Sequence, residues 1–349
     1  MAAARRGGLS AAAHPFAHRP PAIHPTVMDD SLLHLSEVDV ASADLSLARL
    51  RDTVAAVFAA QARGTAQAAP KSVLTMGPGH VFQAKPALMR AEGLAGMKWI
   101  GLVPAAQSSG PTISSLIVLS DIKTGAAVAV MGGNWITATR TAAMTAIAAQ
   151  KLARADSVSI GFVGCGVQAR SHFDALRLVL PDLKEVVACS RSAASAERFA
   201  AMVRAAGLTA RTTHEPREAV EGLDVVITTV PEGAEVLEFL DTAWVTPGAF
   251  VGAVDLARSW KRGTLRAMDI LVTDEHEQTR VLTASGRMTF AGPYEADLAD
   301  LASGAFRGRS SPAQRAMFNF SGHALADLAA AQVVYETALQ KGLGTRLTR

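Results

Sequence analysis

A glycine-rich turn that follows a short apolar run is the feature that most constrains this chain. Residues 158–163 (Val-Ser-Ile-Gly-Phe-Val) have the apolar, partly β-branched character of a buried central strand. After them, Gly164 permits a sharp turn, Gly166 lets a pyrophosphate approach the backbone, and Ala169 allows helix and strand to pack closely. Apolar side chains then recur at helical spacing over residues 172–180. This pattern predicts a dinucleotide site at the N-terminus of a helix, with an ordinary strand-to-helix turn as the alternative.

The composition is that of a globular chain with room for two domains. Of its 349 residues, 49% are hydrophobic and 19% are charged, so a large core can form without a membrane segment. The net charge is only +3 and the basic residues are scattered, so we expect neither a nucleic-acid nor a membrane partner. Cys165 and Cys189 fit no disulfide framework and no zinc pattern, so no metal is predicted and the cytoplasm is the expected location.

Residues 1–27 differ from the rest of the chain. They contain three arginines and four prolines, and no acidic residue. Because proline breaks an amphipathic helix, we interpret this segment as a disordered N-terminal extension, with Met28 as the effective start. A transit peptide is the alternative interpretation.

The next region, residues 28–150, favours a strand-rich α+β domain that is largely antiparallel. Its expected strands cover residues 31–36, 72–75, 97–100, 113–120 and 126–131, and its expected helices cover residues 46–62 and 137–153. A helix over residues 324–340 is expected to fold back onto this domain, so that residues 320–349 complete it.

Residues 151–319 alternate strands with helices. Strands are expected at residues 158–163, 186–189, near 209, 224–229, 249–254 and 269–273, and a helix at 193–206. Such alternation is typical of a doubly wound parallel sheet of the Rossmann type, so the predicted fold class is α/β. Ligands of such sheets bind beyond the carboxyl ends of the strands, and Asp255 directly follows one of them.

Three motifs in this chain are more specific in combination than any glycine pattern alone. They are residues 137–143 (Thr-Ala-Thr-Arg-Thr-Ala-Ala), the turn over residues 164–169, and residues 321–327 (Ser-Gly-His-Ala-Leu-Ala-Asp). Through them the chain resembles the ornithine cyclodeaminase/mu-crystallin family, from about Leu32 to Gly344. The resemblance implies a nicotinamide dinucleotide as cofactor, chemistry at a C=N bond beside a carboxylate, and a homodimer built through the substrate-binding first domain.

The resemblance also implies roles for individual residues. Lys98 matches the family's active-site lysine, Arg140 its carboxylate-binding arginine, and Thr112 a threonine on the substrate side. Asp255 matches an acidic residue that can exchange a proton with the substrate nitrogen. Lys71 falls where the family usually has a second carboxylate-binding arginine, and this departure keeps the charge but loses the paired donors. The structural alternatives are a surface ion pair for Arg140, a strand-edge lysine for Lys98 and a helix cap for Asp255.

The run Gln83-Ala84-Lys85-Pro86 is a second departure from the family pattern. Ornithine cyclodeaminases typically carry Glu-Leu-Met-Pro there, so a carboxylate is missing and a lysine has appeared. This change works against a substrate that has a second ammonium group. If Lys71 and Lys85 both face the pocket, we expect a substrate with a second anionic group instead.

The end of the second strand of the predicted parallel sheet bears on the choice of cofactor. NAD sites usually have an acid there that binds the ribose hydroxyls, whereas this chain has Ser190, Arg191 and Ser192. Because the arginine and the two hydroxyls can hold a 2′-phosphate, NADP(H) is favoured and NAD(H) is the alternative. The other expected cofactor contacts are Thr141, Gly164, Gly166, Val167, Gln168, Ala169, Thr229 and Gly322.

These inferences together favour an NAD(P)H-dependent imine reductase or amino-acid dehydrogenase. Its substrate would be a small 2-imino acid or a cyclic ketimine carboxylate. One alternative is an ornithine cyclodeaminase, which converts ornithine to proline and ammonia with recycled NAD. Another is a crystallin-like protein that uses NADP only to shape a binding site for a small molecule.

Overall fold

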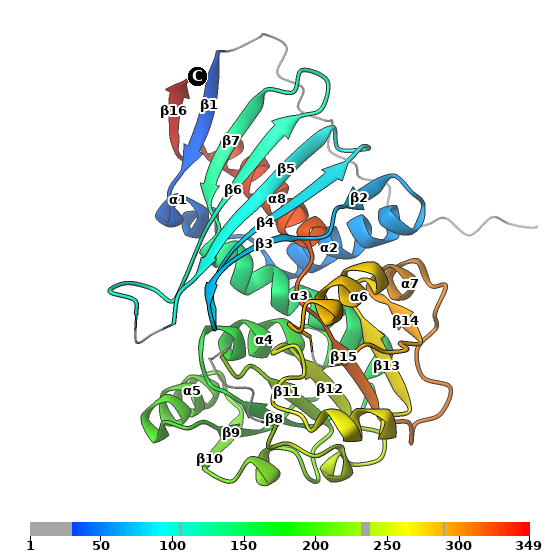
Figure 1. Ribbon diagram of the computed structural model, residues 1–349. Helices are drawn as coiled ribbons and strands as arrows, with labels where there is room; N and C mark the ends of the chain where they lie inside the picture. Colours follow the sequence, from blue (N-terminus) through cyan, green and yellow to red (C-terminus); the bar gives the residue numbers. More distant parts are fainter. Residues whose placement is uncertain (1–29, 105–106, 232–237, 289) are drawn as a thin grey trace, which may run out of the picture. The chain divides into compact units, whose positions relative to one another are not determined.

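The glycine-rich turn follows a strand of a parallel sheet (Figure 1). The computed structural model describes residues 30–104, 107–231, 238–288 and 290–349. The eight strands of the parallel sheet have the order β10-β9-β8-β11-β12-β15-β13-β14. They are β8 (Ser159–Val163), β9 (Glu185–Cys189), β10 (Thr209–Thr213), β11 (Val225–Thr228), β12 (Phe250–Ala253), β13 (Ile270–Thr273), β14 (Ala296–Asp297) and β15 (Ala316–Asn319). The expected α/β class with a parallel sheet is confirmed. The expected extension, residues 1–27, and Met28 lie outside the described residues.

The two faces of this sheet are covered differently. On β11, Val225 and Ile227 pack on one face and Val226 on the other, as the two-residue period of a strand requires. The first face packs against α3 (Asn134–Leu152), α4 (Val167–Arg177) and α5 (Ala193–Ala205). The second face is covered by short 3-10 helices, η1 (Pro216–Ala219), η2 (Thr242–Trp244) and η3 (Arg262–Ala267). Burial on both faces explains why these strands are apolar runs in the sequence.

The second sheet is largely antiparallel and joins the first strand to the last. Its order is β16-β1-β7-β6-β5-β4-β2, with β3 beside β4. Among the described pairings of this second sheet, only that of β1 with β7 is parallel. The strands are β1 (Ser31–Leu35), β2 (Ala66–Ala68), β3 (Ser72–Gly77), β4 (His80–Met89), β5 (Leu94–Leu102), β6 (Ile113–Asp121), β7 (Ala127–Gly132) and β16 (Thr345–Thr348). Residues Ser31–Arg349 cluster as one compact unit, so the division of the chain into two domains stays a prediction.

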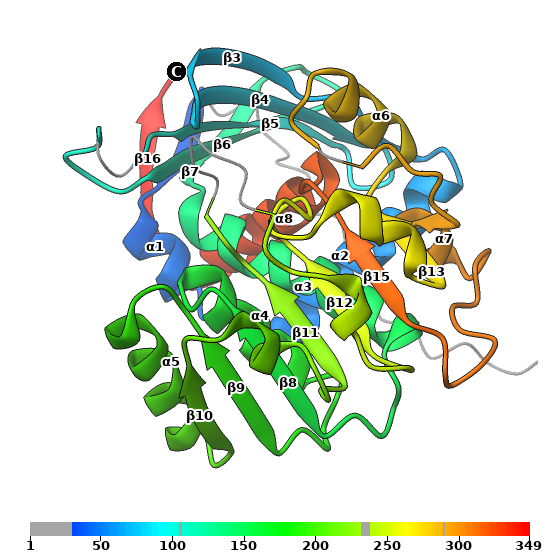
Figure 2. The same ribbon diagram turned by 60° about the horizontal axis from the view of Figure 1, so that its bottom comes forward.

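Long helices connect the two sheets. Figure 2 shows α3 and α8 (Ala324–Lys341) between them, and α2 (Leu47–Ala62) packs against both helices. Most side chains of α3 are buried, and one apolar cluster continues from the antiparallel sheet to the parallel one. Glu37, in α1 (Glu37–Ser42), accepts the Asn134 N–H at 2.8 Å and so satisfies a free donor at the N-terminus of α3. Two further helices in the described part of the chain are α6 (His276–Ala284) and α7 (Leu298–Ser303).

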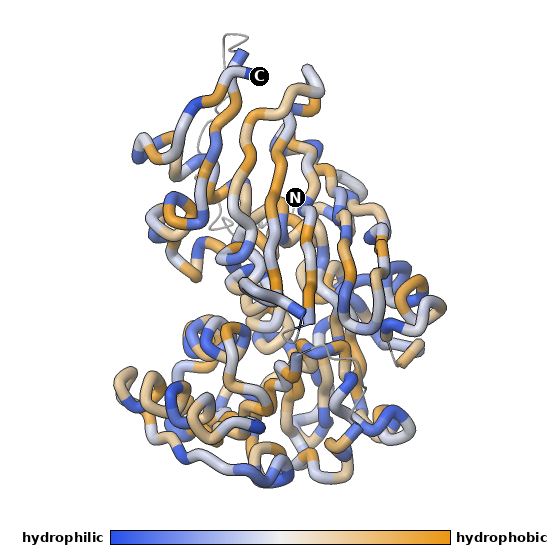
Figure 3. Tube along the Cα trace, turned by 60° about the vertical axis from the view of Figure 1, so that its left-hand side comes forward, coloured by the Kyte–Doolittle hydropathy of each residue, from blue (hydrophilic) through white to orange (hydrophobic). Residues whose placement is uncertain are grey.

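The outer face of the antiparallel sheet carries exposed apolar side chains. Leu74, Trp99 and Leu116 lie on β3, β5 and β6, and Trp99 stacks on Phe82 of β4 with 5.8 Å between the ring centres. Figure 3 shows apolar segments running along the strands of this sheet. An exposed patch of this kind marks an interaction surface more often than a solvated face.

The boundaries differ from the sequence expectations in a few places. Helix α3 begins at Asn134, three residues before the expected start at Thr137. Strands β2, β4, β14, β15 and β16 were not expected at all. Within the described part of the chain, no helix combines the length and the apolarity that crossing a membrane requires.

Candidate active site

A cavity of about 200 Å³ lies at the carboxyl ends of β11 and β12, against α3 and the antiparallel sheet. The predicted site residues that line it are Lys71, Arg140, Thr141, Gln168, Asp255 and Gly322. Gln83 and Lys85, from the run that departs from the family pattern, line it as well. The carboxyl end of a parallel sheet is where folds of this class bind their ligands. The cavity therefore brings together side chains from both sheets.

Asp327 on α8 holds two cations at the back of the cavity. Its Oδ1 accepts a hydrogen bond from Lys98 Nζ and another from Arg140 Nε, each at 2.6 Å. Burial alone would raise the pKa of Asp327, but the charges of Arg140 and Lys98 hold that pKa below its ordinary value. Nε carries the ion pair and Nη1 also donates to Met144 Sδ at 3.6 Å, so the remaining Nη donors of Arg140 are free of the carboxylate of Asp327.

The structure places Lys98 behind the cavity wall, which differs from the expected contact with substrate. Its side chain is fully buried, and Nζ also donates to Thr137 Oγ1 at 3.2 Å. Burial, followed by the charge of Arg140, lowers the pKa of Lys98 well below its ordinary value. Lys98 therefore shares the carboxylate of Asp327 with Arg140 and does not itself line the cavity.

Three lysines lie side by side on the inner face of the antiparallel sheet. Lys85 and Lys98 are directly opposite each other across β4 and β5. Lys71 immediately precedes Ser72, which pairs with Ala84, so it stands beside Lys85. We call Lys71, Lys85 and Lys98 the lysine row; they are 9%, 5% and 0% exposed. Like charges directly opposite one another destabilise a sheet, so the row is costly for the fold alone.

Two members of the lysine row donate to backbone carbonyls that precede α8. Lys71 Nζ donates to the Ser321 carbonyl at 3.1 Å, and Lys85 Nζ to the Gly322 carbonyl at 3.5 Å. Burial is the main cause that lowers the pKa of both lysines, to about 8 for Lys85. Gly322 has a φ of +83°, and a Cβ there would lie 2.7 Å from an Arg140 nitrogen. Only glycine therefore lets this turn lie against the guanidinium group.

Asp255 faces the cavity from the parallel sheet. Thr228 Oγ1 donates to its Oδ1 at 2.8 Å, and Ser259 Oγ donates to its Oδ2 at 2.7 Å. Burial raises the pKa of Asp255, and the two hydroxyl hydrogen bonds oppose that shift. The next two residues, Leu256 and Ala257, have positive φ values of 61° and 53°, which non-glycine residues rarely adopt. Strained turns of this kind are concentrated at functional sites.

The glycine-rich turn has the predicted strand-turn-helix structure. Gly164 has a φ of +96°, and a Cβ there would lie 2.8 Å from the Thr229 carbonyl oxygen, so the turn itself requires glycine. Gly166 has a φ of −88°, and a Cβ there would meet no described atom within 4 Å. The fold does not need glycine at this second position. Since Gly166 caps α4 without a side-chain hydrogen bond, the N–H groups of Val167 and Gln168 remain suited to a phosphate.

The helix that follows the turn is fixed to α3. Ala169 is fully buried, as close packing of helix and strand requires. His172 places Nδ1 2.7 Å from the Gln168 carbonyl and Nε2 2.9 Å from Thr145 Oγ1. Burial lowers the pKa of His172 to about 4, so the ring is neutral at physiological pH. This histidine has a structural role that keeps the first turn of α4 in place.

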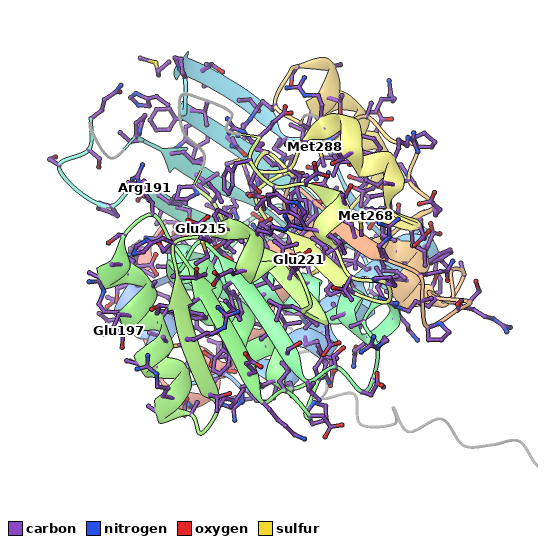
Figure 4. The ribbon with its side chains drawn as sticks, turned by 90° about the horizontal axis from the view of Figure 1, so that it is seen from below. Arg191, Glu197, Glu215, Glu221, Met268 and Met288 are labelled. Atoms are coloured by element: carbon purple, nitrogen blue, oxygen red, sulfur yellow. The ribbon has the colours of Figure 1, made fainter. Side chains whose placement is uncertain are left out.

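The region predicted to recognise the ribose follows β9. Figure 4 shows Arg191 in the connection between β9 and α5, apart from Glu197 on α5 itself, and its side chain is exposed. Ser190 is partly buried at the end of β9. Ser192 is the N-cap of α5, and its side chain accepts the Ser195 N–H. Neither serine adds a charge, so the arginine is the one ionic group of the 190–192 segment.

Thr112 lies outside the cavity wall, in contrast to its expected place beside the substrate. Its side chain is exposed before β6, and its carbonyl accepts the Val103 N–H at 2.9 Å. The following residue, Ile113, lines the cavity instead. Thr229 donates to the Gly164 carbonyl at 3.0 Å and so braces the glycine-rich turn.

Three charged residues of the site had no role in the sequence analysis. Asp327 was part of a motif, but nothing in the sequence indicated that it would bind Lys98 and Arg140. Asp274 directly follows β13, as Asp255 follows β12, and its Oδ2 accepts the Ser321 N–H at 3.1 Å. The rule that ligands bind at carboxyl ends of strands was therefore a usable signal for Asp274. Arg287 follows α6 and lines the cavity, and no sequence signal pointed to it.

One further cluster of metal-ligating side chains occurs away from the cavity. In the described part of the chain, His276, Asp297 and Asp300 bring their ligand atoms within 4.8 Å of one another. Asp297 and Asp300 form the capping box of α7, in which each side chain accepts the other's backbone N–H. Helix capping accounts for the placement of both acids.

Comparison with known proteins places the chain in a family. Residues 31–342 match the model of the ornithine cyclodeaminase/mu-crystallin family. The alanine dehydrogenase of Archaeoglobus fulgidus is 32% identical over 312 residues, which cover 87% of this chain and 94% of that protein. The solved archaeal alanine dehydrogenase dimer with bound NAD has a TM-score of 0.82 at 30% identity, covering 91% of this chain and 99% of that chain. The Thermococcus litoralis Delta(1)-pyrroline-2-carboxylate reductase, solved with NADH and L-proline, has a TM-score of 0.82 at 27% identity, covering 90% and 99%. The chain therefore belongs to the ornithine cyclodeaminase/mu-crystallin family.

Proposed function

We propose that this protein is an NAD(P)H-dependent reductase that acts on the C=N bond of a 2-imino acid or a cyclic ketimine carboxylate. The observation that carries the proposal is that Arg140 and Asp255 line the same small cavity from different elements. A guanidinium group binds a carboxylate through paired N–H donors, and a buried carboxylic acid can protonate a nitrogen. The Thermococcus litoralis relative, a pyrroline-2-carboxylate reductase by name, acts on a bond of this type.

The glycine-rich turn fits a nicotinamide dinucleotide. The space at Gly166 and the N–H groups that open α4 suit its pyrophosphate, and Thr141 and Gln168 line the cavity beside them. When bound, the reduced nicotinamide supplies a hydride. NADP(H) is favoured because Arg191 is exposed where an NAD site would usually carry an acid. NAD(H) is the alternative, and it is the cofactor named for both solved relatives.

The residues of this chain supply binding and proton transfer. The Nη groups of Arg140 bind the substrate carboxylate, while Asp327 fixes the guanidinium through Nε. Burial keeps a proton on Asp255 at higher pH than on an exposed aspartate, because it raises the pKa of the carboxyl. Asp255 donates that proton to the imine nitrogen, and the resulting iminium carbon accepts the hydride. The product is an amine, the cofactor is oxidised, and Asp255 regains a proton from water.

A second copy of the chain is the proposed partner of the exposed apolar face. Leu74, Trp99 and Leu116 form a patch on the outer face of the antiparallel sheet, and a flat apolar sheet face suits a self-complementary interface. The archaeal alanine dehydrogenase relative is described as a dimer. Replacing Trp99 with glutamate is expected to yield monomers in light scattering, whereas an unchanged mass would exclude this face as the interface.

The cavity lining disfavours a cyclodeaminase. Such an enzyme must accommodate the second ammonium group of a diamino acid. Here Gln83 and Lys85 line the cavity, so an uncharged amide and a cation stand where a carboxylate would favour that ammonium. A diamino substrate would therefore meet repulsion from the lysine.

One set of assays tests the proposal. The purified protein is mixed with NADPH or NADH and a panel of imines, formed from 2-oxo acids with ammonium or supplied as cyclic ketimine carboxylates. We expect net cofactor oxidation that falls sharply in Arg140→Met, with the exposed Arg177→Met as control. Formation of proline and ammonia from ornithine without net cofactor turnover would instead indicate a cyclodeaminase. No reaction in either assay would leave a binding protein.

A further inference from the structure

We propose that Lys71 and Lys85 form a second anion subsite, so that the substrate is a 2-imino dicarboxylic acid and not a monocarboxylic one. This inference rests on the proposed function and names the substrate class of the same cavity. It starts from the lysine row, which brings three buried ammonium groups to one face of the antiparallel sheet. One of the three is accounted for by an ion pair, and the other two require an explanation.

The cations around the cavity differ in what neutralises them. Lys98 and Arg140 share the carboxylate of Asp327, at 2.6 Å each. Lys71 and Lys85 instead donate to the carbonyl oxygens of Ser321 and Gly322, which carry no net charge. An ammonium group has three donors, so each of these two lysines keeps donors for a ligand. Both line the cavity, which sets those donors beside any molecule that it holds.

The buried ammonium groups of the lysine row repel one another when no anion is bound. Burying ammonium groups close together is unfavourable, and the register sets Lys85 directly opposite Lys98. Burial is the main cause that lowers the pKa of Lys85 to about 8; the charge of Asp327 opposes this shift, and the charge of Arg140 adds to it. Asp274 offsets part of this charge, but its oxygens already accept from the Ser321 N–H and from Gln278. An anionic group between Lys71 and Lys85 would relieve the repulsion and restore both charged forms.

Together the polar groups specify three points on the substrate. Arg140 binds the carboxylate next to the imine, Asp255 faces the nitrogen, and the two lysines bind a carboxylate at the far end of the side chain. A monocarboxylic imine leaves the two lysines uncompensated, and a diamino acid adds a further positive charge. Charge complementarity therefore selects the dicarboxylic class.

The test compares matched substrates with one or two carboxylates. Imines formed with ammonium from 2-oxobutyrate and oxaloacetate, and from 2-oxopentanoate and 2-oxoglutarate, are reduced at pH 7.5 by the wild type and by Lys85→Met. We expect the wild type to favour the dicarboxylic member of each pair in kcat/KM, and K85M to lower that preference about ten- to a hundredfold. Lys85→Arg should retain most of the preference because it keeps the charge. Lys151→Met, at an exposed position of α3, should leave the ratio as it is.

The outcomes separate this inference from the proposed function. Reduction of imines with no dicarboxylate preference, or with an equal loss on both members of a pair in K85M, overturns the second subsite and leaves the reductase intact. If no imine is reduced at all, the reductase proposal fails, and calorimetry in the presence of NADP still decides the subsite. In that measurement 2-oxoglutarate must bind more tightly than 2-oxopentanoate, and K85M must remove the difference. Equal affinities would refute the inference.

Discussion

The cationic wall of the cavity, which we define as Arg140 with Lys98 and Asp327 behind it, is held by contacts between residues far apart in the sequence, whereas the wall that carries Asp255 is held by contacts within the parallel sheet and the turn that follows it. Asp327 is separated from Arg140 by 187 positions and from Lys98 by 229. Asp255, by contrast, is fixed by Ser259, four residues later, and by Thr228 on the neighbouring strand. The cationic wall therefore exists only when β5, α3 and α8 have docked. The acid wall needs only the parallel sheet and the turn that follows β12.

This difference teaches that the two walls fail in different ways. A change at the local wall removes a chemical group and leaves its neighbours uncharged and hydrogen-bonded. A change at the cationic wall leaves buried charges without a partner, so it lowers the stability of the fold as well as the activity. The following substitutions can break or sharpen the comparison, in order of the size of the expected effect.

The largest effect is expected at the local wall, from Asp255→Asn. We expect kcat to fall about 100- to 10,000-fold because the proton donor is lost, while the free energy of unfolding changes little. Because burial raises the pKa of Asp255, the wild-type kcat should decline as pH rises through that pKa, and the variant should lack this decline. Steady-state kinetics across pH, with the exposed Asp182→Asn as control, measures both effects. Activity within a few fold of the wild type would remove Asp255 from the chemistry.

The next effect concerns the cationic wall. Asp327→Asn leaves Lys98 and Arg140 buried without a counter-ion, and we expect it to lower the free energy of unfolding by about 3–5 kcal/mol. Lys98→Met should cost less, because one carboxylate then faces one guanidinium group. Urea unfolding of the two variants measures the difference, and a raised substrate KM in K98M would show that the lysine positions Arg140. If K98M were as destabilising as D327N, charge balance would not be what this cluster provides.

The smallest effects are expected at the glycine-rich turn, where two neighbouring positions should behave differently. Gly164→Ala forces a positive φ on a residue with a Cβ and presses it against the Thr229 carbonyl, so we expect a loss of about 1–3 kcal/mol in stability. Gly166→Ala fills space that the fold leaves open, so stability should hold while dinucleotide affinity falls about tenfold. Thermal unfolding and cofactor titration separate the two. Unchanged cofactor affinity in G166A would contradict the expected approach of the pyrophosphate.

The parallel sheet was the most predictable part of the fold. Strands such as β11 and β12 are buried on both faces, so their sequences are unbroken apolar runs that periodicity detects. Strand β15 was missed because Ala316–Asn319 has no β-branched side chain and ends in a polar residue. Its place between β12 and β13 comes from tertiary pairing that no local pattern reveals.

Strand β4 was missed for a different reason. Pro86 in the middle of the segment is atypical of a strand, since proline has no N–H to donate. In the structure β3 pairs with β4 as far as Ala84, and β2 begins to pair at Ala87. Pro86 falls in the gap between these two partners, so the missing donor breaks no ladder on that side. The proline is visible in the sequence, but the gap between β2 and β3 that accommodates it is visible only in the structure.

The candidate site was predictable in its residue types more than in its contacts. Family resemblance pointed to Arg140, Asp255 and Lys71, and the structure brings all three to one cavity. It could not show that Lys98 lies behind the wall, because that depends on a carboxylate from the last long helix. The exposure of Thr112 likewise depends on where β6 begins.

The apolar cluster that runs unbroken between the two sheets limits how the molecule can move. A hinge between halves has to separate the surfaces that meet at it, and here α3 is buried along nearly its whole length at that junction. Separating the two sheets would expose apolar surface of that helix to water, at a free-energy cost of about 25 cal/mol for each Å². We therefore expect the two sheets to keep their relative placement while ligands bind and leave.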